Sequence, residues 1–503
     1  MPMDYEKRDT GRIPESVGTP LDMVFVQTMA GPDAEPYPAE EDEPTTYYCG
    51  IMKGVTFDKE VGTPTLDGEL TSRRDYVYNL CSGSYIEEDS IVAAFVKNGR
   101  LWTMDAVKPA GLITFSEDPS VAANPSLSRY KGTTGALIGS RVLTSTATYD
   151  IGPMRSDAAG NVYYVTHDLQ GSTQGALYLR KTNRRCVQQW SVTLHADGDT
   201  IGTFADCEVT PDGKVYALTN GTLNGPVSTD EIDPLTYYVA KVAEYDTDGN
   251  AVGSWEVQTD AGGANIEAST AEATALAVRA DGKVAVGVNI DNYGPVGFGG
   301  TIVRSKSEVQ LANADGSSAW RCVVNSVTGG HTAGHVLAIA CGTDGAVYCT
   351  RTGNTGPFVT KISASGSVVW DKPISDYSAS VAIGQFTRSI CTDGDDNVYV
   401  GARNDTNTKF YTLKINGSTG AYIWHHATAD TSYMMPFNDR GSRLAVRGDH
   451  VWAVNPTQAG GASTVPTLYK LERSTGAEAA AVNTIRSETA CTIAPGRWPL
   501  FEA

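Results

Sequence analysis

Two short acidic stretches place enough oxygen ligands close together to suggest cation binding. DTDGN at 246–250 and DGDDN at 393–397 each concentrate carboxylates and amides in one turn, and such a turn suits hard cations such as Ca2+. A complete EF-type loop would need Glu at its twelfth position, where Val257 and Asn404 stand instead. A hairpin turn whose Asp bonds its own backbone is the alternative that we prefer. The calcium candidates are Asp246, Asp248, Asn250, Asp393 and Asp395.

The histidines offer a second set of groups for chemistry. His331 and His335 have the four-residue spacing of a helical metal site, but the segment GGHTAGH is too rich in glycine for a helix and lacks the Glu of an HExxH motif. His425 and His426 are adjacent, so they point to opposite faces of a strand. The chain has no GxSxG elbow, phosphate loop or GxGxxG turn after a strand. We therefore predict a non-enzymatic protein without a catalytic set, a cofactor or a metal.

Charge and hydropathy argue against several functional classes. The 503 residues carry a net charge of −19, so there is no basic stripe to neutralise nucleic-acid phosphates. No apolar run is long enough to predict a membrane span. The first segment, MPMDYEKRDTGRIPES, is charged and lacks the apolar core of a secretory signal. Nine cysteines without a CxxC pair predict free thiols in a reducing compartment.

The elements that must position these groups repeat along the chain. KINGSTGAYIW at 414–424 combines a Lys, a Thr-Gly turn and a Trp, and related segments recur roughly every 50 to 65 residues. A second motif pairs an Asp-Gly or Gly-Asn turn with a β-branched run, as in DGKVYAL and DGAVYCT. This motif predicts a hairpin turn that leads into a half-buried strand. The repeated tryptophans are Trp190, Trp255, Trp320, Trp370 and Trp424.

The repeats predict an array of similar sheets. Each repeat reads as four antiparallel strands, and such sheets form a β-propeller when neighbours cover each other's faces. A β-solenoid is the main alternative, but its repeats are shorter, about 20 to 30 residues. Each Trp is expected to pack between blades as a large apolar wedge. The predicted fold class is all-β, a six- to seven-bladed β-propeller preceded by an extended arm and a small β-barrel or sandwich domain.

Composition divides the chain into segments. The acidic, Pro-rich run PDAEPYPAEEDEP cannot bury much surface and predicts an extended arm. Alternating strands follow it, and Asn98-Gly99 is a strong two-residue hairpin signal. Further apolar runs near the C-terminus suggest that both ends of the propeller join in ring closure. The predicted divisions are 1–45 for the arm, 46–110 for the small β domain, 111–147 for a connector or extra blade, 148–482 for the propeller, and 483–503 for the tail or ring closure.

The segments STGAYIW and STGAEAA resemble the repeats of quinoprotein-dehydrogenase-type propellers, and the resemblance spans 148–482. It implies the propeller fold. Enzymes of that family use a quinone cofactor held with calcium, a catalytic aspartate and often a vicinal cysteine pair. This chain has no Cys-Cys pair, so we do not expect quinone catalysis from it.

The small β domain ends in a segment that resembles small β domains of bacteriophage virion proteins. In those domains a strand, an NGRxW turn and a second strand close a compact barrel. A hairpin in any other β domain is the alternative interpretation. The residues that carry the resemblance are Gly83, Asp89, Ala94, Asn98, Gly99, Arg100 and Trp102.

Two long connections are rich in Asn, Asp, Tyr and Gly, namely 220–238 and 289–301. This composition suits hydrogen bonding to sugars and stacking on them, and loops on a rigid scaffold commonly carry binding residues. Solvated loops have the same composition. The candidate ligand-binding residues are Asn220, Tyr237, Asn289, Asn292 and Tyr293.

These observations favour a non-enzymatic structural protein of a bacteriophage virion, associated with the tail. The arm and the small β domain would dock to other virion proteins, and the propeller would be displayed for binding to a protein or a host-surface glycan. Assembly would take place in the host cytoplasm, with no nucleic-acid partner and no membrane span, and the oligomeric state stays open. The alternatives are a carbohydrate-binding propeller, a quinone-type propeller enzyme and a bacterial cytoplasmic scaffold.

Overall fold

The computed structural model consists of strands, and the predicted all-β class is confirmed. Among the described residues the elements are strands β1 to β35 and one 3-10 helix, η4 (Ile374–Asp376). No helix in this described part is long and apolar enough to cross a membrane. The structure describes the backbone of these elements and of some of the short turns between them. Side chains are described at Leu127 and, with gaps, from Met154 to Ala481; the longest gaps are 195–205, 222–239, 259–270, 292–304, 378–388, 429–443 and 455–467.

The chain forms two compact units, which we call unit 1 and unit 2. Unit 1 consists of Met1–Gly111, Lys131–Thr133 and Leu500–Ala503. Unit 2 consists of Leu112–Tyr130 and Thr134–Pro499. The division between the units therefore falls close to the end of the predicted small β domain at residue 110.

Unit 1 contains a five-stranded sheet in the order β1-β2-β6-β7-β5. Within it β5 and β7 run parallel, and the other neighbours run antiparallel. Strands β6 and β7 pair antiparallel with Lys97 opposite Arg100, as expected for the predicted hairpin, while the turn residues 98–99 lie outside the described residues. The strands of unit 1 are β1 (Met23–Ala30), β2 (Pro44–Met52), β3 (Val55–Phe57), β4 (Pro64–Leu66), β5 (Val77–Asn79), β6 (Ser90–Lys97) and β7 (Arg100–Val107).

The structure corrects the prediction of an extended arm over 1–45. Strand β1 lies inside that segment and pairs along its length with β2, from Met23 opposite Gly50 to Ala30 opposite Pro44. The stretch MVFVQTMA is rich in β-branched and aromatic residues that favour strands. We missed this signal because the acidic, Pro-rich run next to it dominates the composition of the segment.

Unit 2 contains seven four-stranded antiparallel sheets among its described strands. In six of them the four strands are consecutive in the chain, so we name these sheets by their first and last strands. The first three are β11 (Tyr149–Ser156), β12 (Val162–Asp168), β13 (Ala176–Thr182) and β14 (Gln188–His195); β15 (Thr203–Val209), β16 (Val215–Asn224), β17 (Thr236–Tyr245) and β18 (Ala251–Glu256); and β19 (Ala268–Val278), β20 (Val284–Tyr293), β21 (Ile302–Ala312) and β22 (Ser318–Thr328). The next three are β23 (Val336–Cys341), β24 (Val347–Arg351), β25 (Phe358–Ile362) and β26 (Val368–Pro373); β27 (Gln385–Thr392), β28 (Val398–Arg403), β29 (Phe410–Ile415) and β30 (Tyr422–Ala427); and β31 (Leu444–Arg447), β32 (His450–Asn455), β33 (Thr467–Glu472) and β34 (Glu478–Asn483).

The last sheet joins the two ends of unit 2. It has the order β10-β9-β8-β35, so three of its strands come from the segment 111–147 and the fourth comes from the C-terminal segment. Cys491 lies opposite Ser116 and Ala494 opposite Ile113 in the β35–β8 pair. The strands are β8 (Leu112–Ser116), β9 (Ser126–Tyr130), β10 (Leu137–Val142) and β35 (Cys491–Ala494).

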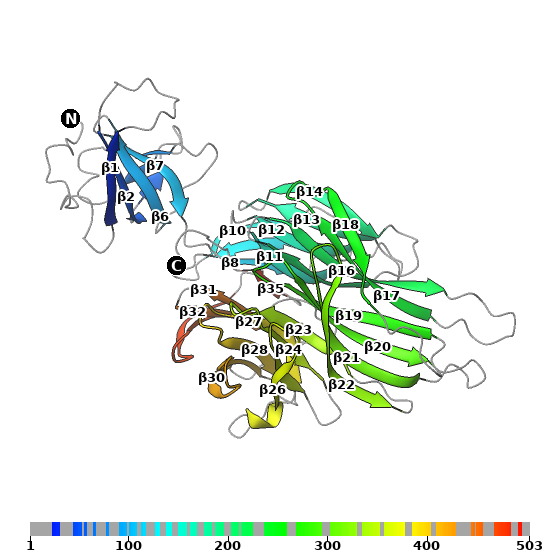
Figure 1. The fold of residues 1–503 in the computed structure, drawn as a ribbon. Coiled ribbons are helices and arrows are strands. Elements are labelled where there is room, and N and C mark those ends of the chain that lie inside the picture. The colour runs from blue at the N-terminus through cyan, green and yellow to red at the C-terminus, as the bar shows by residue number, and fades with distance from the viewer. Residues whose placement is uncertain are drawn as a thin grey trace, which may run out of the picture. The chain divides into compact units, whose positions relative to one another are not determined.

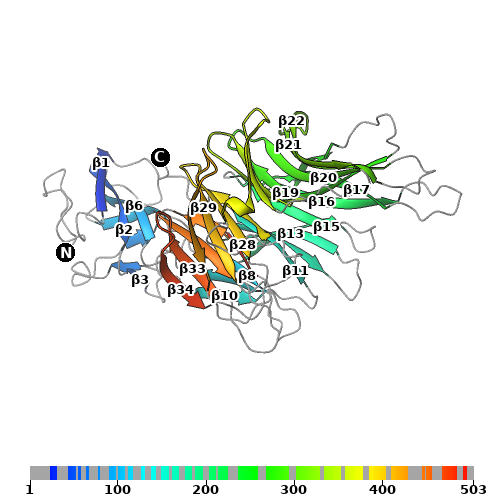
Figure 2. The same cartoon turned by 90° about the horizontal axis from the view of Figure 1, so that it is seen from below.

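The sheets of unit 2 are arranged in a ring (Figures 1 and 2). The first strands contact one another in the order β11, β15, β19, β23, β27 and β31, and β35 contacts both β31 and β11. These contacts close into a cycle, so each sheet packs between two neighbours. The predicted β-propeller class is confirmed, and the linear stack of a solenoid is excluded for these strands.

The apolar core lies between the sheets. Between sheets β23–β26 and β27–β30, for example, Tyr348 from the first sheet packs with Val398 and Leu413 from the second, and all three are fully buried. Similar clusters lie at the neighbouring junctions. Burial of one such side chain contributes about 1.5 to 3 kcal/mol, and a single sheet has no face on which to bury it without its neighbour.

Candidate functional site

The repeated tryptophans lie on fourth strands, each against the next sheet. Every one of the five rings contacts a Gly in the turn between the third and fourth strands of that sheet. A Cβ added at Gly476 would lie 2.6 Å from a ring carbon of Trp424, and Gly476 has a φ of 73°, which other residues rarely adopt. Glycine is required there for both reasons. The five pairs are Trp190–Gly249, Trp255–Gly316, Trp320–Gly366, Trp370–Gly420 and Trp424–Gly476.

At four of these five described junctions, one backbone carbonyl accepts two hydrogen bonds from the preceding sheet. Arg473 O accepts from Trp424 Nε1 at 3.1 Å and from Lys414 Nζ at 2.9 Å. Lys414 also lies over the ring of Tyr399, 5.5 Å from its centroid. At this junction the Lys and Trp of one repeat and the Gly turn of the next therefore form one contact between sheets. At the other three junctions, too, one backbone carbonyl accepts from a Trp and from a second side chain. These carbonyls and their second donors are Thr247 O with Lys181 Nζ at 2.8 Å, Ala364 O with Arg279 Nη1 at 3.2 Å, and Gly417 O with the Tyr348 hydroxyl at 3.3 Å.

The junction between sheets β15–β18 and β19–β22 is more polar. Gln310 donates to Gln258 O at 2.6 Å and accepts from Gln258 N at 3.1 Å. Next to it, the fully buried Glu308 pairs with Lys306 at 2.9 Å and accepts from Arg321 Nε at 2.8 Å. A buried carboxylate is tolerated only when it is paired in this way. The Gln310–Gln258 pair thus joins the two sheets, whereas the ion pairs of Glu308 lie within sheet β19–β22.

The structure corrects the placement of the predicted ligand-binding residues, because none of the five lies in a loop. Asn220 is in β16, and Asn289 and Asn292 are in β20. Tyr237 is in β17 and Tyr293 ends β20; the side chains of Tyr237, Asn292 and Tyr293 lie outside the described part. The strands continue further than predicted because their backbones stay paired, as from Asn220 opposite Ala240 onward.

Asn220 serves a structural purpose. Its side chain is 2 % exposed, and it donates to Ala273 O and accepts from Ala273 N, both at 2.8 Å. The amide thus replaces a strand neighbour for β19 and joins sheet β15–β18 to the next sheet. Both polar atoms of the side chain are used, so Asn220 is not a ligand-binding residue.

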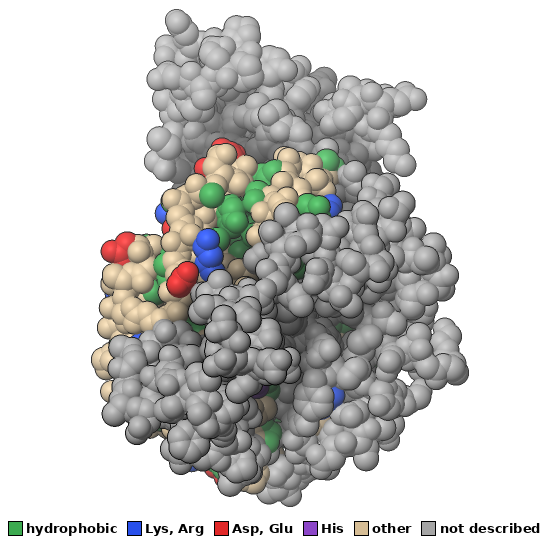
Figure 3. Space-filling view, turned by 90° about the vertical axis from the view of Figure 1, so that its right-hand side faces the viewer, with side chains coloured by type: hydrophobic (Ala, Val, Ile, Leu, Met, Phe, Trp, Pro, Cys, Tyr) green, Lys and Arg blue, Asp and Glu red, His purple; other side chains and the backbone are tan. Residues whose placement is uncertain are grey.

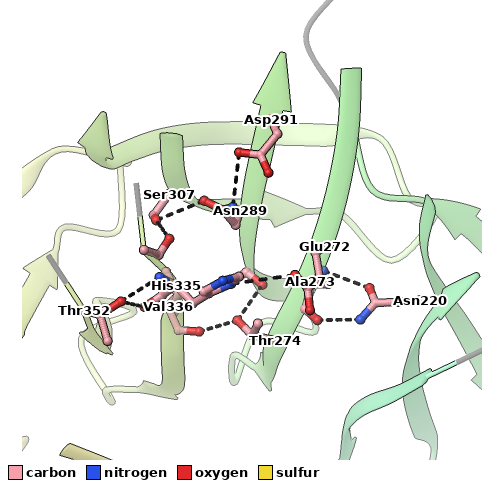
Figure 4. A network of polar contacts seen from close by, with 12 residues as sticks. Asn220, Glu272, Ala273, Thr274, Asn289, Asp291, Ser307, His335, Val336 and Thr352 are labelled. Atoms are coloured by element: carbon pink, nitrogen blue, oxygen red, sulfur yellow. Dashed lines mark hydrogen bonds and ion pairs between the residues drawn. The ribbon is translucent and has the colours of Figure 1, made fainter. Parts of the chain in front are cut away.

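Asn289 instead belongs to a polar group at the junction of sheets β19–β22 and β23–β26 (Figure 4). Glu272, Asn289, Ser307 and Asn325 lie directly opposite one another on β19, β20, β21 and β22, so they form one polar row across the sheet. Asn289 and Ser307 are buried, at 3 % and 0 % exposure. They form the floor of the group, and Ser307 Oγ donates to Gly334 O.

The orientation of the Asn289 amide decides which of its neighbours it satisfies. In one orientation Nδ2 faces Asp291 Oδ1 at 3.4 Å. In the other it donates to Gly334 O at 2.9 Å and to Lys306 O at 3.1 Å. We adopt the second orientation because its contacts are shorter and it satisfies two backbone carbonyls. The carboxylate of Asp291 then receives no hydrogen bond from Asn289.

The exposed rim of the group consists of Glu272, His335 and Asp291. The side chains of Glu272 and His335 are 42 % and 38 % exposed, and Glu272 Oε2 lies 3.9 Å from His335 Nδ1. Thr352 fixes the backbone of His335, because His335 N donates to Thr352 Oγ1 at 2.8 Å and Thr352 N donates to His335 O at 2.9 Å. The rim therefore stands on strands and backbone hydrogen bonds, at the start of β23 and near the start of β19.

This arrangement is suited to binding. Ser307 donates to a backbone carbonyl, which leaves its hydroxyl without the base that a nucleophile needs. The rim offers two carboxylates and an imidazole, which mainly accept hydrogen bonds. From the sequence, His335 was weighed as a metal ligand and that interpretation was rejected, and no motif pointed to Glu272, Asp291 or Ser307. Only the register of four strands brings them together, and no local motif marks that register.

A second buried cluster links the first strands of three sheets. Arg155 on β11 donates to Glu208 Oε2 at 2.9 Å and lies 3.3 Å from Asp206 Oδ1, both on β15. Asp206 Oδ2 accepts from Leu276 N on β19 at 2.9 Å. Burial raises the pKa of Asp206 to about 6, although Arg155 acts in the opposite direction. The cluster spans β11, β15 and β19 and contains a carboxyl group, that of Asp206, whose pKa of about 6 is close to neutral.

The two calcium candidates are turns whose carboxylates bond their own backbone. Asp246 Oδ1 accepts from Asp248 N at 2.9 Å and from Asn250 N at 2.8 Å, and Asp393 Oδ1 accepts from Asp395 N at 3.0 Å. Hydrogen bonds from Asn250, its side chain first, lower the pKa of Asp246. Within the described residues, no group of three or more His, Cys, Asp or Glu side chains could hold a metal ion.

One face of the molecule can be inspected for charge in Figure 3. The described Lys, Arg, Asp and Glu side chains on that face are scattered among uncharged ones, and they do not gather into a single patch. Among the described side chains of that face, charge therefore does not mark a second site.

Comparisons with known proteins place the chain among distant structural neighbours. Neither a protein-family model nor a curated protein sequence matches it. A solved protein from Lactobacillus plantarum is 12 % identical, with a TM-score of 0.46 over 76 % of this chain and 99 % of that one. A puromycin hydrolase is 13 % identical, with a TM-score of 0.46 over 75 % of this chain and 53 % of that one. A Hadza microbial sialidase is 11 % identical, with a TM-score of 0.40 over 73 % and 74 %. Likeness at this level says nothing about the activity of this chain.

Proposed function

We propose that this chain is a non-enzymatic structural protein of a bacteriophage virion, associated with the tail, whose ring is displayed for binding at the host surface. The observation that carries the binding part is the rim of Glu272, His335 and Asp291, which is partly exposed and held on paired strands. Binding residues on rigid elements keep their geometry without paying an ordering cost when the ligand arrives.

The contacts between sheets support a display role. Each described Trp–Gly contact ties one sheet to the next, and most add a carbonyl with two donors. A frame of this kind holds its surface groups at fixed separations. The virion part of the proposal rests on the sequence, namely the order of small β domain and propeller, and the resemblance of the segment around Asn98 to virion β domains.

A carbohydrate-binding propeller outside a virion is the second candidate, because the same rim would serve it. A quinone-type enzyme is the remaining alternative, suggested by the resemblance of the STGAYIW repeats. Reconstitution with a quinone and calcium separates the two: we expect no quinone absorption band in the loaded protein, and a stable band would contradict the non-enzymatic assignment.

The virion assignment is tested by fractionation. Particles released from the cells that encode the chain would be purified on a density gradient, and the chain would be detected by mass spectrometry and by antibody labelling in electron micrographs. We expect the chain to sediment with particles and the label to lie on tails. Recovery of the whole chain in the soluble fraction of the cells, with none in particles, would contradict the virion role and favour the cytoplasmic scaffold.

A further inference from the structure

The chain contains four Asn-Gly pairs, and the structure describes the Asn side chain in two of them, Asn220-Gly221 and Asn416-Gly417. In such a pair the backbone nitrogen of the Gly can attack the side-chain carbon Cγ of the Asn, because the Gly has no side chain to hinder the approach. The atoms between them close into a succinimide ring, and ammonia leaves. Water then opens the ring to Asp or to isoaspartate. The surroundings of the two amides affect this reaction in opposite ways.

Asn416 follows β29 and opens the turn to β30, and its side-chain oxygen accepts four hydrogen bonds. The donors are Ser418 N at 3.0 Å, Ser418 Oγ at 2.7 Å, Thr419 N at 3.0 Å and Thr419 Oγ1 at 3.1 Å. Negative charge develops on this oxygen when Cγ is attacked. Donors that are already fixed around it therefore bind the transition state more strongly than the ground state, as in an oxyanion hole.

The attacking nitrogen and the leaving nitrogen are not held. Within the described part of the chain, neither Gly417 N nor Asn416 Nδ2 donates a hydrogen bond that the reaction would have to break. Asn416 is half-buried, and Ser418 and Thr419 are exposed, so water and hydroxide reach the turn. The hydrogen bonds on this side chain thus lie on the one atom where they favour the reaction.

Asn220 carries the same dipeptide in surroundings that oppose the reaction. Its side chain is 2 % exposed, and its Nδ2 and Oδ1 bond Ala273 O and Ala273 N, both at 2.8 Å. Gly221 lies within β16 and pairs with Val239 on β17. Attack on Asn220 would break both amide hydrogen bonds and disturb a paired strand. Asn220 is therefore a comparison for Asn416 within the same chain.

Packing fixes the Gly of the reactive pair and makes its position important. A Cβ on Gly417 would collide with Asp396 O, so the Gly cannot be exchanged for a residue that would slow the attack. Gly417 O accepts from Trp370 Nε1 at 3.1 Å and from the Tyr348 hydroxyl at 3.3 Å. Isoaspartate adds one carbon to the main chain just before this carbonyl and so displaces it from both donors.

From this geometry we propose that Asn416 is a site of spontaneous deamidation, and that its isoaspartate product loosens the junction between sheets β23–β26 and β27–β30. The bond from Gly417 N to Asn416 Cγ forms and the bond from Cγ to Nδ2 breaks. The proton of Gly417 N leaves with the amine as ammonia. Water then adds to one of the two ring carbonyls, and no other reactant is required. The modification does not depend on the proposed function.

The test is to incubate the full chain at mildly alkaline pH and to follow each Asn-Gly pair by peptide mass spectrometry. Replacement of –NH2 by –OH gives the mass gain, and electron-transfer fragmentation separates isoaspartate from Asp. We expect deamidation at Asn416 to be at least about tenfold faster than at Asn220. In concentrated urea the two pairs should react at similar rates, because their local structure is lost. Ser418→Ala and Thr419→Val should each slow the reaction at Asn416 about fivefold, because each removes one hydroxyl donor.

Asn416→Asp is the matched control, because its carboxylate keeps the acceptor oxygen and has no amine to lose. This variant should melt at the temperature of the fresh chain, whereas chains that carry isoaspartate at 416 should melt lower. The proposal is overturned if Asn416 deamidates no faster than Asn220, if Ser418→Ala leaves the rate unchanged or raises it, or if chains with isoaspartate melt like fresh ones. Melting temperatures of the Ser418→Ala and Thr419→Val chains, measured before incubation, show whether their folds are unaltered.

Discussion

At the scale of single residues, the contact between Trp and Gly is the feature that recurs most regularly. It needs a ring on one sheet and a bare backbone on the next, and positive φ values make the same glycines necessary for the turn. Steric contact and backbone strain therefore act at one position. Other glycines of the chain separate the two effects.

Alanine substitutions at three glycines test this interpretation. Gly476→Ala should cost about 2 to 4 kcal/mol of stability, because it adds strain at φ 73° and a clash with Trp424. Gly282→Ala has the strain, at φ 81°, but an open space around the new Cβ, so about 1 kcal/mol is expected. Gly253→Ala has neither and should change stability by less than about 0.5 kcal/mol. Denaturant midpoints give the ranking, and an equal loss at all three positions would contradict the role of the ring contact.

Asp206 links stability to pH. Its pKa is raised by burial from 3.8 to about 6 in the folded chain, so the folded state holds the proton more tightly than the unfolded state does. The resulting stabilisation is complete below about pH 4 and is lost as the pH rises through about 6. The size of the loss is on the order of 3 kcal/mol.

Asp206→Asn should remove this dependence. Relative to the unaltered chain, the variant is expected to gain stability as the pH rises from 4 to 7, as measured by denaturant unfolding at each pH. Asp246→Asn is the control of opposite sign: the pKa of Asp246 is lowered, so that variant should lose stability relative to the unaltered chain as the pH rises through the acidic range. A stability difference for Asp206→Asn that does not vary with pH would show that its carboxyl does not titrate as described.

At the scale of elements, the sheet β10-β9-β8-β35 determines whether the ring is closed. Its innermost strand, β35, pairs with β8 and contacts both β31 and β11. Closure therefore depends on the pairing of strands whose positions in the chain are far apart. Because β35 contacts several strands, we expect it to contribute more to the stability of the ring than its four residues suggest.

Two deletions test the closure. Removal of 491–503 deletes β35 and exposes the edge of β8, and we expect the melting temperature to fall by about 5 °C or more with a tendency to aggregate. Removal of 496–503 leaves β35 in place and should have a much smaller effect. Equal melting temperatures for the two truncated chains, measured by scanning fluorimetry, would contradict a closing role for β35.

At the scale of the whole molecule, the chain consists of two units with separate contacts. Unit 1 has its own five-stranded sheet, and unit 2 has the ring. Compact units with their own cores commonly unfold as separate cooperative steps. The two units should therefore be distinguishable by calorimetry.

We expect two calorimetric transitions for the full chain. Unfolding enthalpy scales with the number of residues, so the larger transition should carry roughly three quarters of the total. A single transition whose calorimetric and van't Hoff enthalpies agree for the whole chain would show that the units unfold together.

The sequence by itself determined the repeat, the turn chemistry and the fold class. The Asp-Gly turns, the alternation of residues along the strands and the motifs that recur with the repeat period are all properties of short stretches. KINGSTGAYIW, for example, contains the end of β29, the turn after it and the Trp of β30. It also indicated the hairpin at Asn98-Gly99. The prediction that Asn220 and Asn289 lie in loops was wrong. The stretches that contain them have the composition of loops, but pairing with neighbouring strands decides their conformation.

Only the tertiary structure decided which side chains meet. Glu272 and Ser307 are 35 positions apart in the chain, and they share a polar row because β20 lies between β19 and β21 in one register. Likewise, the partner of each Trp is a Gly of the following sheet. Register and the packing of sheets are long-range properties that depend on every strand at once, and for this reason the rim could not be read from any single stretch of sequence.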